Sequence, residues 1–73
     1  MAKSFNRSLL VLTNGRTLKL DIPEEEVEDV WPEFIDHLNW GEVWDVGKWG
    51  NVIAEFNGEQ LSYINMNLVV AVI

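Results

Sequence analysis

Acidic residues at helical spacing are the first groups in this sequence that could do chemistry. Residues 21–36 are rich in Asp and Glu, and neither Lys nor Arg occurs between Lys19 and Lys48. Pairs four residues apart include Glu24 and Glu28, Glu25 and Asp29, and Asp29 and Glu33. On a helix such pairs face each other, and could share a proton or bind a divalent cation. The spacing has no calcium-loop pattern and no ligands from a second element, so it favours a solvated face over a metal site.

The remaining groups do not form a recognisable catalytic set. His37 is the only histidine and cysteine is absent, while Ser4, Ser8 and Ser62 have no partner pattern for nucleophilic catalysis. A single histidine supplies only one member of such a set, so a structural role near a helix end is favoured for His37. The sequence therefore predicts a protein that is not an enzyme and uses neither cofactor nor metal.

The four tryptophans divide into two groups. Trp31 shares a helical stripe with Val27 and Phe34, which predicts a core position. Trp40, Trp44 and Trp49 flank glycines in residues 40–50, and a small domain cannot easily bury all three. Exposed tryptophans would suit a protein contact or a stacking platform for a planar ligand, while burial in the core or in a subunit contact is the alternative.

The charge balance restricts the classes of partner. Twelve Asp and Glu residues against five Lys and Arg give a net charge of −7. Binding to nucleic acid or to an anionic membrane needs a basic surface, so both are disfavoured, whereas a basic protein partner is favoured. The apolar run 8–12 is too short for a signal peptide, nothing approaches a membrane span, and we expect a cytoplasmic protein.

Two elements are predicted before the tryptophan-rich segment. Asn14-Gly15 lies between the apolar run 8–13 and the alternating segment 16–20, which predicts a tight β-hairpin with both turn residues at positive φ. A helix is expected over about 23–39, capped by Asp21 in a capping box with Glu24, kinked at Pro32, and ended by Asn39 and Gly41. The apolar stripe stays in phase across the proline, although two abutting short helices would also fit. The stripe consists of Val27, Val30, Trp31, Phe34, Ile35 and Leu38.

The second half of the chain predicts further strands. Residues 42–46 fit a short strand or an ordered loop, and strands are expected over 52–56, 60–64 and 68–72, with turns at Asn57-Gly58 and at 65–67. The predicted fold is therefore α+β, a single small domain over 1–73. It has a mostly antiparallel sheet of about five strands, built from a β-hairpin, one kinked helix and a β-meander, with the helix packed on one face. An apolar last strand would be either central or an edge covered by another subunit, and we expect a homo-oligomer.

Two functions remain open at this stage. The first is a non-enzymatic binding protein that occupies a basic site on another protein, such as a small viral or bacterial inhibitor that imitates nucleic acid. Its contact residues would be Glu24, Glu25, Glu28, Asp29, Glu33, Asp36, Trp40, Trp44 and Trp49. The second is a homo-oligomer with an aromatic interface pocket for a nucleotide-like ligand. That pocket would use Arg16, Trp44, Lys48, Trp49 and Tyr63.

Overall fold

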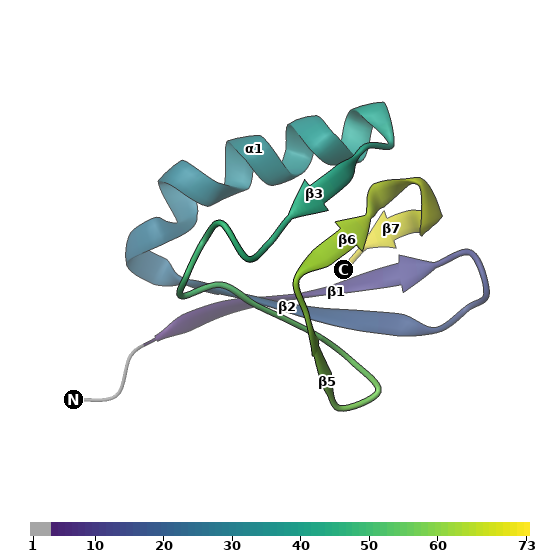
Figure 1. The fold of residues 1–73 in the computed structure, drawn as a ribbon, viewed down its shortest axis with the longest axis horizontal. Coiled ribbons are helices and arrows are strands. Elements are labelled where there is room, and N and C mark those ends of the chain that lie inside the picture. The colour runs from purple at the N-terminus through teal and green to yellow at the C-terminus, as the bar shows by residue number, and fades with distance from the viewer. Residues whose placement is uncertain (1–3) are drawn as a thin grey trace.

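The computed structural model describes residues 4–73 and shows an α+β fold, as the sequence predicts (Figure 1). A five-stranded antiparallel sheet has the order β5-β4-β2-β1-β7, and a separate two-stranded sheet pairs β3 with β6. The predicted domain includes residues 1–3, which lie outside the described residues. The strands are β1 (Phe5–Leu12), β2 (Thr17–Pro23), β3 (Val43–Asp45), β4 (Ile53–Phe56), β5 (Glu59–Leu61), β6 (Tyr63–Asn65) and β7 (Val69–Val72). The helical elements are the 3-10 turns η1 (Glu24–Glu26) and η2 (Met66–Leu68) and the α-helix α1 (Val27–Trp40).

The hairpin predicted at Asn14-Gly15 joins β1 to β2, but its turn is longer than expected. The Leu12 N–H donates to the Arg16 carbonyl at 2.8 Å, and the Gly15 N–H donates to the Leu12 carbonyl at 2.9 Å. The loop therefore has three residues, with Gly15 at φ 84° and Asn14 outside the positive-φ region. Asn14 instead accepts a hydrogen bond from the Arg16 N–H through its side chain, which holds the turn locally.

The predicted capping role of Asp21 is wrong, because Asp21 belongs to β2. Strand pairing continues to Phe5 opposite Pro23, so Asp21 lies across from Arg7. The Arg7 guanidinium donates two hydrogen bonds to the Asp21 carboxylate, at 2.7 and 2.9 Å. Neither η1 nor α1 has a side-chain cap at its start. A long-range partner across the hairpin therefore replaces the local capping partner.

The predicted helix is present as η1 followed by α1, which passes through Pro32 without ending. Its first two turns are rich in Glu and Asp, which complement the positive end of the helix dipole. Gly41 ends the helix in the left-handed conformation, at φ 63°, as the sequence predicts. The helix covers one face of the large sheet (Figure 1) and buries Val30 and Phe34 against it.

Trp44 completes the core and also places β3. Its side chain is fully buried, and its ring centroid lies 5.4 Å from that of Phe34. Opposite it in the small sheet is Ile64 of β6, which is also buried. Residues 43–45 pair with β6 and are therefore a strand rather than a loop. Alternation along this strand directs Trp44 inward and leaves Val43 and Asp45 exposed.

The C-terminal strands do not form a continuous meander. Asn57 and Gly58, at φ 53° and 80°, make the predicted tight turn between β4 and β5. The chain then bends at Ser62, so the strand expected over 60–64 is split between the two sheets. After η2, β7 reaches the opposite side of the large sheet and pairs with β1. The split allows Leu61 to pair with Ala54 while Ile64 pairs with Trp44, so each apolar residue covers a different part of the core.

Candidate functional site

The outer surface of the helix is the most strongly charged part of the described chain. Val30 and Phe34 face the sheet, so residues on the far side of α1 face water. Asp29, Asp36 and Trp40 follow each other on that side at spacings of seven and four residues, and all three are exposed. We use the term acidic face for five exposed acids together with the exposed tryptophan that follows them. These residues are Glu24, Glu25, Glu28, Asp29, Asp36 and Trp40.

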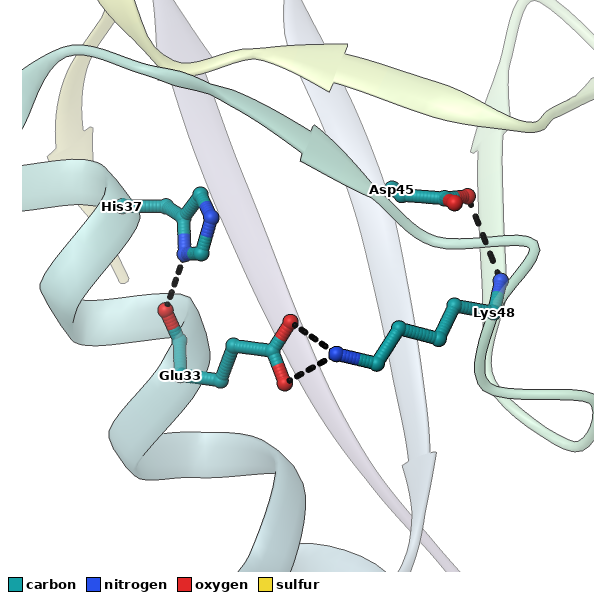
Figure 2. Close-up of polar contacts among 4 residues, drawn as sticks. All are labelled: Glu33, His37, Asp45 and Lys48. Carbon is teal, nitrogen blue, oxygen red and sulfur yellow. Dashed lines mark hydrogen bonds and ion pairs between the residues drawn. The ribbon is translucent and has the colours of Figure 1, made fainter.

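Glu33 is one of the predicted contact residues, but its carboxylate already forms an ion pair with Lys48. The Lys48 ammonium donates to both carboxylate oxygens of Glu33, at 3.1 and 3.2 Å (Figure 2). The Lys48 backbone N–H donates to the Asp45 carboxylate at 3.2 Å, which fixes the loop after β3. This contact ties the loop to the helix, and we therefore assign Glu33 a structural role.

The other cations of the described chain do not neutralise the acidic face. Two side-chain ion pairs are present within residues 4–73, Lys48 with Glu33 and Arg7 with Asp21. The hydrogen bonds from Arg7, together with its charge, hold the pKa of Asp21 below its ordinary value of 3.8, against an opposing effect of burial. Arg16 closes the hairpin loop opposite Leu12, and Lys19 lies opposite Glu55 on the neighbouring strand. The carboxylates of the acidic face are thus without an ion-pair partner in this part of the chain.

The structure separates the three tryptophans that the sequence groups together. Trp40 is 74% exposed at the end of the helix, beside Asp36 one turn earlier. Trp49 is half-buried, and the Lys48 ammonium lies 5.6 Å from its ring centroid. Trp44 is fully buried, which is the core alternative, so it cannot touch a partner in this conformation. Only Trp40 therefore offers a large aromatic surface next to the acids.

Within residues 4–73 of one copy, a cavity is lined by one of the five residues expected at the interface pocket. This cavity, of about 280 Å³, lies between the β1–β2 hairpin and the segment that runs from β4 to η2. Of the five expected residues, Tyr63 alone lines it, while Trp44 is in the core and Lys48 bonds to Glu33. The other lining residues are Leu12, Asn14, Leu18, Phe56, Leu61, Ile64, Asn65 and Leu68. This lining is mostly apolar and has no cation to meet a phosphate.

His37 is held within its own helix. Its Nδ1–H donates to the Glu33 carbonyl at 2.8 Å, because a carbonyl oxygen can only accept (Figure 2). Among residues 4–73, no three side chains of His, Asp or Glu gather as a metal site requires. Within the same residues, no helix has the length and apolar character needed to cross a membrane.

The outward face of the small sheet, which sequence reasoning did not describe, consists of Val43, Asp45, Tyr63 and Asn65. Val43 is 58% exposed and Tyr63 is 61% exposed, on neighbouring strands and on the side away from Trp44. Val43 follows Trp40 by three residues, just beyond the end of the helix. Successive side chains of a strand point to opposite faces, so an inward Trp44 requires Val43 and Asp45 to point outward. The sequence would have indicated this surface only if Trp44 had been assigned to the core.

Together these features define a small α+β protein whose acidic face has no ion-pair partner within residues 4–73 and has an exposed tryptophan at its end. Comparison with protein-family models, with curated proteins and with solved structures gave no match to this chain. Function must therefore be inferred from the geometry.

Proposed function

We propose that this chain is a non-enzymatic binding protein whose acidic face occupies a basic site on another protein. The observation that supports this proposal is the series of five exposed carboxylates, unpaired within residues 4–73, along a helical segment that ends at the exposed side chain of Trp40. Lys48, which lies near the helix, already binds Glu33. A partner rich in Lys and Arg would supply the missing counter-charges, and Trp40 would supply an apolar anchor.

The acidic face carries an electrostatic cost in the free protein. Glu25 and Asp29 are like charges four residues apart across the junction of η1 and α1, and their repulsion offsets part of the favourable interaction of these acids with the helix dipole. A solvated face made only for solubility would serve equally well with Lys interspersed among the acids. The single sign of the charges therefore favours recognition, since a basic partner would remove the repulsion.

The spacing of the acids supports imitation of a nucleic-acid backbone. Asp29 and Asp36 lie seven residues apart, which is about 10.5 Å along a helix axis at 1.5 Å per residue. Four successive phosphates on one strand of B-DNA span three steps and advance by about 10 Å along its axis. A small viral or bacterial inhibitor of a protein that handles nucleic acid fits this geometry.

The test is affinity capture from a cell lysate with the wild-type chain and two charge-reversal variants. Asp29→Lys changes the acidic face, whereas Glu59→Lys makes the same change in net charge on the exposed edge strand β5. We expect wild type and Glu59→Lys to retain the same basic protein, released by rising salt, and Asp29→Lys to lose it. Circular dichroism establishes that both variants fold.

Trp40→Ala provides a second measurement with no change in charge. Trp40 is largely exposed, so its removal should leave the free energy of unfolding within about 0.5 kcal/mol of the wild-type value. Binding should weaken if the ring is an anchor, by more than about tenfold for a central contact. Unchanged capture by folded Asp29→Lys, or by the double variant Glu25→Lys and Asp29→Lys, would refute the proposal.

A further inference from the structure

The edge strand β7 is a second candidate surface for binding a partner. It pairs with β1 on one side only and forms one edge of the large sheet. Leu9 and Ile73 exchange both backbone hydrogen bonds, at 2.9 and 2.8 Å. Because bonding alternates along an antiparallel strand, the N–H and carbonyl of Val72 point away from β1 toward the open edge.

The two edges of the sheet differ in their protection. Proteins usually guard edge strands with charges or with very short strands. The β5 edge is three residues long and carries Glu59, so pairing two copies there would bring carboxylates together. The four residues of β7, Val69–Val72, are all apolar. A register shift between Val11 and Leu12 leaves Val70 between the paired residues Val69 and Ala71, and the pairing is regular from Ala71 onward. The β7 edge is therefore the edge that carries no charged side chain.

The distribution of charge selects a second copy of this chain as the occupant. Residues 60–73 contain no Asp, Glu, Lys, Arg or His, in a chain of net charge −7. Two equally acidic copies repel each other, so contact between them is opposed least at a segment without charged side chains. The exposed apolar side chains on this segment include Leu68 at 46%, Val70 at 63% and Ile73 at 75%.

We propose that β7 pairs antiparallel with β7 of a second copy, and joins the two large sheets into one across a two-fold axis. A strand paired with itself in this way is self-complementary, as a two-fold dimer requires. The Val72 N–H and carbonyl of each copy would bond to the other copy. A dimer of standard size buries about 800 Å² per partner, which is about one-sixth of this chain's 4798 Å² surface. A four-residue ladder is smaller than that, so Leu68 and Ile73 must contribute to the contact.

The first test is the mass in solution of the full chain over a concentration series from about 1 μM to about 1 mM, a range that covers weak association. Wild type should pass from 8.4 kDa to twice that mass. Val70→Glu should weaken the dimer by at least about tenfold, since its carboxylate must lose water at the contact. Val43→Glu is the matched control, with the same change in charge at a site of similar exposure on β3, and it should dimerise as wild type does.

Amide hydrogen exchange gives a second measurement that does not depend on the variants folding. The Val72 amide should become protected as concentration rises, whereas the Ile73 amide, bonded to Leu9 at 2.8 Å, should be protected throughout. A monomer at every concentration would overturn the proposal, as would a dimer more sensitive to Val43→Glu than to Val70→Glu. Protection of Val72 only after a different protein is added would also overturn it, since the edge would then take another chain. The acidic face plays no part in these measurements, so the two proposals fail separately.

Discussion

Substitution of Trp44 tests whether this tryptophan lies in the core, a position that the sequence left open against a protein or ligand contact. Trp44 is fully buried, its ring centroid lies 5.4 Å from that of Phe34, and its buried indole Nε1 has no hydrogen-bond partner among residues 4–73. Replacing a buried tryptophan with alanine removes its apolar burial and leaves a cavity, at a cost of about 3–5 kcal/mol. A 73-residue domain has a free energy of unfolding of about 4–11 kcal/mol. Trp44→Ala should therefore lose a large part of the stability or fail to fold.

Trp44→Phe separates packing from the unpaired indole N–H. The smaller ring loses burial and leaves a small void, at a cost of about 1–2 kcal/mol. The same change removes a buried donor whose lack of a partner costs about 1–3 kcal/mol. The two effects oppose each other, so we expect the free energy of unfolding of Trp44→Phe to lie within about 1 kcal/mol of wild type.

Urea unfolding followed by far-UV circular dichroism measures these differences, because a shift in midpoint at constant slope reports stability. Trp40→Ala is the control, since Trp40 is 74% exposed. The expected order of midpoints is wild type, Trp40→Ala and Trp44→Phe close together, with Trp44→Ala far below. If Trp44→Ala lost less than about 1 kcal/mol, or if Trp40→Ala lost more than Trp44→Ala, the core position of Trp44 would be refuted.

Two further predictions concern the hairpin and the end of the helix. The pKa of Asp21 is lowered in the folded state, so its contribution to stability is present above its unfolded value near 3.8 and is lost as pH falls through the folded value. The stability difference between wild type and Arg7→Ala should therefore narrow below about pH 4, and a difference that widens in acid would contradict the ion pair. Gly41→Ala should lose about 1 kcal/mol or more in urea unfolding because φ is 63° there. Gly50→Ala, with open space around its Cβ and no positive φ, should be neutral or stabilising, and equal losses at both glycines would contradict the helix end.

Local patterns in the sequence predicted the elements well. The Asn-Gly dipeptides marked both hairpin turns, because glycine reaches positive φ without strain. The stripe from Val27 to Leu38 predicted the helix and its buried side, and Gly41 marked its end. Such signals depend on residues within one turn or one strand of each other, so they can be read without knowing the fold. The same is true of the acidic face, because the apolar stripe leaves only the opposite side for its carboxylates.

The tertiary structure decided the features that depend on distant partners. Asp21 was expected to cap the helix, but Arg7 binds it across the hairpin. The sequence could not show that Trp44 alone of the three loop tryptophans enters the core, because that depends on the small sheet with Ile64.

The sequence by itself thus determined the element types, the single sign of charge on the helix and the charge-free segment 60–73. Which apolar strand lies at the edge was decided only by the order of the large sheet, which leaves β7 open beside β1. Periodicity specifies the faces of an element, whereas strand order depends on which apolar surfaces can be buried together in three dimensions.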